Sequence, residues 1–253
     1  MKPYLASEVN WQFVRDTAYE VAVLPWGATE AHNYHLPYGT DVYETTAVAA
    51  ESARLAWEQG AKVAALPAVP FGVNTGQLDI PLTINMNPST QLAVLRDVVE
   101  SLELQGIYKL VVLNGHGGND FKHVLRELQG ATEVFISALN WWTCVDTKPF
   151  FDKPGDHGGE LETSLMMHLH PELVRLENAG DGATRPFRIK ALREGWAWAP
   201  RDWRRATVDT GAGDPRAANA EKGENYFRAV AERIAGYLVE LASTPLERLY
   251  EGE

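Results

Sequence analysis

The sequence contains one cysteine, Cys144, among its 253 residues. A single cysteine excludes an internal disulfide framework and is typical of proteins from a reducing compartment. The residues around Cys144 carry no signature of a catalytic thiol, so we interpret it as a small buried side chain.

No block of consecutive basic residues is visible either, and the formal net charge is −11, from 23 Lys and Arg against 34 Asp and Glu. A nucleic-acid-binding surface needs concentrated positive charge, so we expect no nucleic-acid partner. No apolar run approaches the roughly 20 residues that span a bilayer. The first eight residues lack the apolar stretch of a signal peptide, and we therefore expect a cytoplasmic protein without a membrane partner.

The sequence does contain alternating strand and helix signals. Short apolar runs predict strands near residues 21–24, 62–66, 110–113 and 134–139, and helical spacing predicts helices near 42–59, 88–106, 121–128, 161–169 and 217–242. Such alternation predicts a mostly parallel central sheet with helices on both faces, in one α/β domain spanning residues 1–253. Residues 70–88 are expected to form an ordered arm, and residues 180–215 to be irregular.

Carboxylates and imidazoles are most concentrated in residues 30–41, which hold Glu30, His32, His35 and Asp41. Oxygen and nitrogen donors at this density are typical of a divalent metal site. Glu30 and His32 would point the same way along an extended segment. Each residue alone is best interpreted as part of a polar loop, but the four together indicate a metal site.

Two glycine-rich segments carry further histidines, His116 within residues 114–119 and His157 within residues 155–160. The first follows a predicted parallel strand, where ligand crevices of open α/β sheets lie. Glu160 and Glu162 stand at a helix start, where carboxylates also serve as caps. Positions i and i+2 face apart on a helix, so we expect only one of these glutamates to reach the site.

The motifs at residues 26–41, 114–119 and 156–164, with a weaker match at 213–224, resemble those of the creatininase (creatinine amidohydrolase) family. The resemblance implies a three-layer αβα fold and hydrolysis of cyclic or linear amide C–N bonds. It also implies two divalent metal ions per chain and a homohexamer. Zinc is the first expectation for the metal, and manganese or iron would suit the same donors.

The resemblance also implies roles for individual residues. Creatininase has a glutamate ligand where this chain has Gly118, and Glu160 is the expected replacement. The implied metal ligands are Glu30, His32, Asp41, His116 and Glu160, and Asp41 would bridge the two ions. His157 would be the catalytic histidine, and Trp142 would contact the substrate. His35 and Glu162 would contact the ligands without binding a metal themselves.

The substrate is expected to be a small amide other than creatinine, because Gly117, Gly118 and Lys153 differ from creatininase. Other branches of the family deformylate formamidopyrimidines or trim a peptide during cofactor biosynthesis. Three alternatives stay open: an inactive metal- or ligand-binding member, a mononuclear hydrolase, and a peptide-trimming hydrolase in cofactor biosynthesis. The complete ligand set favours an active enzyme, and metal stoichiometry separates the alternatives.

Overall fold

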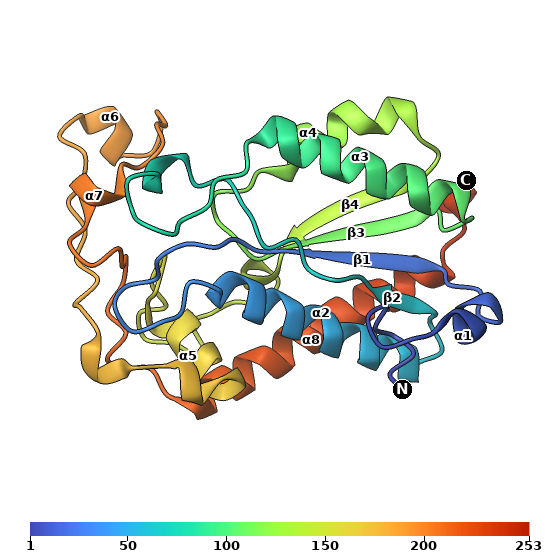
Figure 1. Ribbon diagram of the computed structural model, residues 1–253, viewed down its shortest axis with the longest axis horizontal. Helices are drawn as coiled ribbons and strands as arrows, with labels where there is room; N and C mark the ends of the chain where they lie inside the picture. The colour runs from blue at the N-terminus through green and yellow to red at the C-terminus, as the bar shows by residue number, and fades with distance from the viewer. Residues whose placement is uncertain (253) are drawn as a thin grey trace.

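The computed structural model describes residues 1–252, which form a four-stranded parallel sheet between two layers of helices (Figure 1). The strand order is β2-β1-β3-β4, and the strands span Val63–Ala65, Val21–Trp26, Lys109–Asn114 and Phe135–Asn140 in that order. The helices are α1 (Trp11–Arg15), α2 (Thr40–Glu58), α3 (Pro88–Leu104), α4 (Phe121–Leu128), α5 (Glu160–Leu169), α6 (Lys190–Arg193), α7 (Trp203–Ala206) and α8 (Ala220–Ser243). The predicted parallel αβα arrangement is confirmed.

The two faces of the sheet pack against different helices because side chains alternate along each strand. Val21 and Val23 of β1 pack in one core with α2, α5 and α8. Ala22 and Leu24 pack in a second core with α3 and α4. Both faces are thus buried, which explains why β1 is an almost continuous apolar run.

The carboxyl ends of three strands are aligned, since Trp26 pairs with Asn114, and Asn114 with Asn140. Segments that follow β1, β3 and β4 therefore begin at the same edge of the sheet. This register brings residues far apart in the sequence to one place.

Helix boundaries differ slightly from those predicted. Helix α2 begins at Thr40, two residues before the predicted start, where the Thr40 hydroxyl donates to the Pro37 carbonyl at 2.7 Å. Asp41 therefore lies in the first turn of a helix instead of in a loop. Helix α8 begins after Asn219, whose side chain accepts the N–H of Lys222 at 3.0 Å, as expected of an N-cap.

Two long segments cover the carboxyl edge of the sheet. Residues 70–88 include a short 3₁₀ turn, Thr75–Gln77, and residues 180–215 include α6 and α7 within otherwise irregular chain. The two segments touch, because a Cβ added to Gly76 would lie 2.0 Å from the Arg201 carbonyl oxygen. Among residues 1–252, no helix combines the length and apolar character needed to cross a bilayer.

Candidate active site

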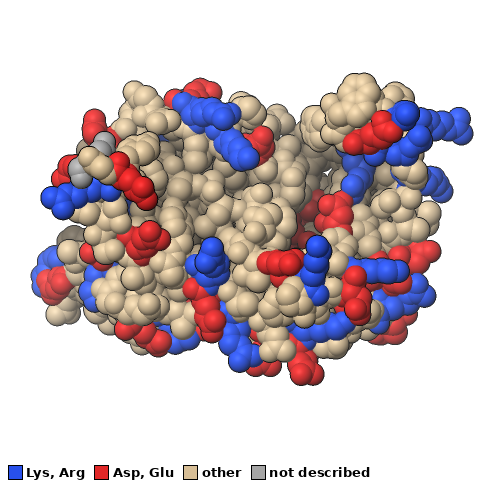
Figure 2. All heavy atoms as spheres, turned by 180° about the vertical axis from the view of Figure 1, so that it is seen from behind, with Lys and Arg blue, Asp and Glu red and all other residues tan. Residues whose placement is uncertain are grey.

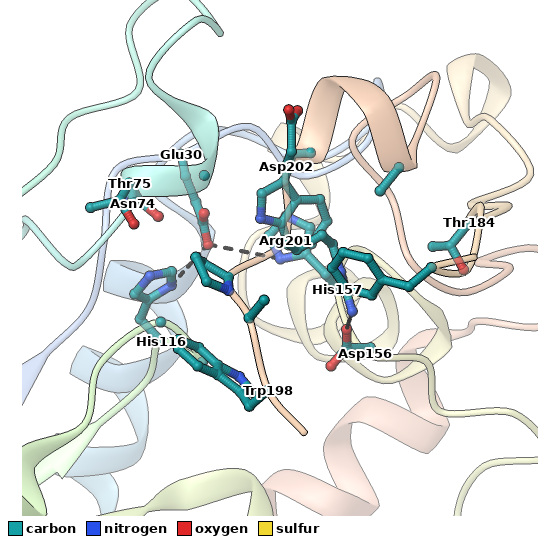
Figure 3. Close-up of a pocket in the computed structure, with 18 of the residues that line it drawn as sticks. Glu30, Asn74, Thr75, His116, Asp156, His157, Thr184, Trp198, Arg201 and Asp202 are labelled. Atoms are coloured by element: carbon teal, nitrogen blue, oxygen red, sulfur yellow. Dashed lines mark hydrogen bonds and ion pairs between the residues drawn. The ribbon is translucent and has the colours of Figure 1, made fainter. Parts of the chain in front are cut away.

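Six acidic and imidazole side chains converge beyond the carboxyl ends of β1 and β3. Glu30 and His32 come from the segment after β1, and His116 from the segment after β3. Asp41 lies in the first turn of α2, His157 in the loop before α5 and Glu162 in the first turn of α5. We refer to these six residues as the carboxylate–histidine cluster. Figure 3 shows the Glu30 carboxylate between His116 and His157.

Asp41 lies between two histidines and presents a different oxygen to each. Asp41 Oδ1 is 2.8 Å from His32 Nε2, and Asp41 Oδ2 is 3.0 Å from His116 Nδ1. Glu30 Oε1 is 2.9 Å from His116 Nδ1 and 3.9 Å from His32 Nε2. All four side chains are buried.

The ligand atoms form three groups in which every atom lies within 4.8 Å of the others. The groups are Glu30 with Asp41 and His116, His32 with Asp41 and Glu162, and Glu30 with His32 and His157. Asp41 Oδ2 is also buried, and its contact with His116 Nδ1 at 3.0 Å is too poorly aligned for a good hydrogen bond. Buried carboxylate oxygens that share their few donors with the imidazole nitrogens suit a cation, so the donor set fits a metal.

Each cluster histidine is held by a backbone carbonyl through its outer nitrogen. Because a carbonyl oxygen can only accept, the outer nitrogen carries the proton and the inner nitrogen of a neutral ring is free to bind a metal. The three contacts are His32 Nδ1 with the Glu30 oxygen (3.2 Å), His116 Nε2 with the Val73 oxygen (3.0 Å) and His157 Nε2 with the Ala31 oxygen (2.8 Å).

The clustered carboxylates alter the protonation of the imidazoles in the metal-free protein. Burial alone would lower the pKa of His32, but the adjacent Asp41 carboxylate outweighs burial and raises the pKa to about 10. The pKa of His116 is likewise raised against burial by Glu30 and Asp41. Protons thus supply, without metal, the positive charge that the carboxylates need.

His157 packs against two aromatic rings. Its ring centroid lies 4.1 Å from that of His32, in a stacked arrangement, and 4.6 Å from that of Trp203. Its Nδ1 atom is 3.8 Å from Glu30 Oε1. These contacts hold the imidazole at the border between the cluster and the cavity.

Glu162 joins the cluster and Glu160 does not. The buried Glu160 carboxylate forms an ion pair with Lys222 and accepts the Lys153 N–H at 2.8 Å. Glu162 instead accepts the N–H of Gly158. Only one of the two glutamates reaches the cluster, as their spacing predicted. It is Glu162, whereas Glu160 was the expected ligand.

The remaining expected residues lie beside the cluster. His35 donates to or accepts from the Thr163 hydroxyl at 2.8 Å, and burial followed by the nearby His32 lowers its pKa to about 4. A neutral His35 behind the cluster agrees with a supporting position. Trp142 lies in the wall of the adjoining cavity.

Gln77 is a further site residue that the sequence did not single out. It is 1% exposed, and its Nε2 donates to Glu30 Oε2, which leaves Glu30 Oε1 for the cluster. Its only sequence signal is a polar residue in the long arm at residues 70–88. Nothing there indicates which polar side chain turns inward.

The cluster opens into a cavity of about 1080 Å³ between the main body and the segment that carries α6 and α7. Figure 2 shows the hollow, with acidic atoms inside it and basic side chains on the adjoining segment. Its walls include Asn74 and Thr75 from one arm and Thr184, Trp198 and Arg201 from the other (Figure 3). The volume lies slightly above the usual range for small-molecule sites, roughly 300–1,000 Å³.

Comparison with known proteins places the chain in one family. A family profile described as "Creatininase: Creatinine amidohydrolase" matches residues 7–238. The chain is 29% identical over 237 residues to a creatinine amidohydrolase of Pseudomonas putida, covering 85% of this chain and 87% of that protein. It is 31% identical over 221 residues to a mycofactocin precursor peptide peptidase of Mycobacterium tuberculosis, covering 83% and 81%.

Comparison with solved structures also places the chain among creatininases. The crystal structure of a presumed creatinine amidohydrolase from Bacteroides fragilis is 45% identical and superposes with a TM-score of 0.92, covering 97% of this chain and 99% of that one. Two creatininase structures at TM-score 0.79 and 25% identity, each covering 96% of this chain and all of the other, are described as "Zn-Zn type" and "Mn". The chain therefore belongs to the creatininase family of hydrolases.

Proposed function

We propose that the protein is a metal-dependent amidohydrolase that cleaves an amide C–N bond at a dinuclear site. The observation that carries this proposal is the position of Asp41, whose two carboxylate oxygens face His32 and His116 separately. A carboxylate in this position can bridge two cations. Two metals near one another supply an activated water and a Lewis acid for the carbonyl oxygen.

The ligand groups suggest how two ions would be shared. Glu30, Asp41 and His116 would hold one ion, and His32, Asp41 and Glu162 the other. We assign the last ligand position to Glu162 instead of Glu160, because the Glu160 carboxylate is already engaged by Lys222. Zinc and manganese both suit this mixture of carboxylate and imidazole donors, and both are named for related creatininase structures.

His157 is the residue to which we assign proton transfer. Its Nε2–H donates to the Ala31 carbonyl, so its Nδ1 is the atom that can accept a proton and pass it to the leaving nitrogen. The rings of His32 and Trp203 hold the imidazole at that position. Gln77 keeps Glu30 turned toward the ligand positions.

The bond proposed for cleavage follows from the relatives. Relatives of this chain are named creatinine amidohydrolase and mycofactocin precursor peptide peptidase. Both names denote cleavage of amide C–N bonds, in a small ring and in a peptide. The large cavity and the departures at Gly117, Gly118 and Lys153 favour a substrate larger than creatinine.

The experiment is a turnover screen of zinc- and manganese-loaded protein over creatinine, small lactams, formamides and short peptides. We expect hydrolysis of a formamide or peptide but not of creatinine. His157→Ala should retain its metal and lose about 10²–10⁴-fold in kcat, the usual contribution of a general acid or base. His123→Ala is the control, since that side chain is 77% exposed and, among residues 1–252, pairs only with Asp120.

Absence of turnover with every amide would refute the hydrolytic proposal and leave a metal-binding protein. Wild-type activity in His157→Ala would instead refute the role of that residue alone. Hydrolysis of peptides only would place the protein beside the peptidases of the family.

A further inference from the structure

The segment that roofs the cavity is basic, unlike the rest of the chain. Residues 184–205 contain seven Arg or Lys residues and two acidic ones, whereas the whole chain carries 23 basic and 34 acidic residues and a net charge of −11. This concentration of positive charge lies next to a cavity whose inner end is acidic.

The positive charges that line the cavity are all arginines. They are Arg185, Arg188, Arg193, Arg201 and Arg205, and no lysine lines it among residues 1–252. Arginine presents a planar fork of N–H donors that matches the geometry of carboxylate and phosphate oxygens, whereas lysine is a single point charge. The residue type therefore favours recognition of an oxyanion.

Most of these arginines lack a carboxylate partner within residues 1–252. Arg201 pairs with Asp156 at 2.8 Å and lies 4.5 Å from the centre of the Trp203 ring. The other four have no carboxylate within 4.0 Å in the part of the chain that the structure describes; Arg185 and Arg193 each donate to a backbone oxygen at 3.4 Å. Asp202, the nearby acid, caps α7 by accepting the Arg205 backbone N–H at 3.2 Å.

The acidic side chains of the cavity are committed elsewhere. Glu30, Asp41 and Glu162 face the histidines in the ligand groups described above. Asp156 is occupied by Arg201. The unpaired guanidinium groups are thus the free charges of the cavity wall.

We infer that the substrate carries an oxyanion, a carboxylate or a phosphate, which these arginines bind while its amide lies at the carboxylate–histidine cluster. This inference rests on the proposed function and names its substrate class. Phe187, Trp198 and Trp203 line the same wall, so a planar group between the amide and the oxyanion would find aromatic surface.

The test compares three probes of matched shape: 4-formamidobenzamide, 4-formamidobenzoate and 4-formamidophenyl phosphate. Binding to the zinc-loaded full chain is measured by titration calorimetry, and formate release is measured separately. We expect at least one anionic probe to bind about tenfold or more tightly than the neutral one, as charge-assisted hydrogen bonds allow. The probe that gains more identifies the oxyanion as carboxylate or phosphate.

The variants locate the binding. Arg188→Gln with Arg205→Gln removes two guanidinium groups that make no hydrogen bond in residues 1–252, and should reduce the preference for the anionic probe to about threefold or less. Lys190→Gln is the matched control, because it removes one charge from the same segment at a side chain that does not line the cavity. It should leave the preference unchanged.

Equal binding of neutral and anionic probes, or binding of none of them, would overturn the inference. So would a preference that survives in the double variant, because the two guanidinium groups that make no hydrogen bond in residues 1–252 would then not hold the anion. Formate release from all three probes without a charge preference would leave the amidohydrolase proposal standing and refute this one. Arginine-dependent binding without any turnover would support this inference and refute the amidohydrolase proposal.

Discussion

At the scale of single residues, the strongest support for a metal centre is the surroundings of the Asp41 carboxylate. Asp41 is 2% exposed, and the contact of its Oδ2 with His116 Nδ1 at 3.0 Å is poorly aligned for a hydrogen bond. Burial of a carboxylate is costly unless its charge is compensated. His32 and His116 supply that compensation as protonated rings in the metal-free protein, and cations would supply it in the loaded protein.

The positions of Glu160 and Glu162 lead to the first prediction, which concerns metal content. Zinc-loaded Glu162→Gln should retain one metal per chain, because it lacks the charged ligand of the His32 group. Glu160→Gln should keep the metal content of the wild type. It should lose roughly 1–3 kcal/mol of stability, because Lys222 is left without its buried partner. Elemental analysis and thermal unfolding of both variants measure these effects. Full metal content in Glu162→Gln, with loss in Glu160→Gln, would restore the original assignment.

The protonation of His32 makes a second prediction, for the metal-free protein. Its folded pKa of about 10 lies above the ordinary value of 6.5, so the protonated ring stabilises the fold fully below about pH 6.5. That contribution is lost as the pH rises through about 10. Chelator-treated protein should therefore melt at a lower temperature at pH 10 than at pH 7.

Zinc-loaded protein is the control for this titration, because a metal replaces the proton on the ring. Its melting temperature should change less over the same pH interval. A metal-free protein whose stability rises between pH 7 and pH 10 would contradict the assignment of charged imidazoles to the cluster.

At the scale of elements, the start of α5 decides which glutamate enters the site. Gly158 has φ of +57°, and its N–H is accepted by Glu162, which therefore turns back toward the cluster. Glu160 points to Lys222, which belongs to α8 and lies 62 residues away in sequence. The i, i+2 spacing predicted that one glutamate would reach the site. It could not say which, because the choice depends on a helix that packs from a distant part of the chain.

The contact between the two covering segments makes a third prediction. A Cβ at Gly76 would lie 2.0 Å from the Arg201 oxygen, so Gly76→Ala must push residues 70–88 and the α7 region apart. We expect a loss of about 1–3 kcal/mol of stability, the usual cost of overpacking. We also expect weaker activity, because Gln77 and Trp203 would shift from Glu30 and His157. Thermal unfolding and formamide turnover measure the two effects.

Gly130→Ala is the control for the alanine substitution, because a Cβ there would meet nothing within 4 Å. It should be close to neutral. If Gly76→Ala were equally neutral, the two segments would not be in contact, and the cavity that they border would not exist in solution in this form.

At the scale of the whole molecule, the sheet and its layers could be predicted from local patterns. Buried strands such as β1 and β3 are short apolar runs, β3 is followed by a Gly-rich segment, and the intervening helices have clear apolar spacing. The cavity could not be predicted in this way. Its walls come from residues 70–88 and 180–215, whose positions are fixed by long-range contacts such as the one between Arg204 and Asp79 at 3.5 Å.

Some expectations about the whole molecule stay predictions. A homohexamer, a cytoplasmic location and a single domain over residues 1–253 were derived from the sequence or its resemblance. The confirmed family and the parallel αβα fold are consistent with them, and each needs a measurement on the intact protein.

The central claim is that Asp41 bridges two metal ions. Its most direct test is the metal content per chain, by elemental analysis of zinc-loaded and desalted protein, for the wild type and Asp41→Ala. Asp97→Ala, at an exposed position on α3, is the control. The proposed site predicts two metals per chain in the wild type and the control, and loss of metal together with activity in Asp41→Ala. One metal in the wild type, or two retained by Asp41→Ala, would contradict it.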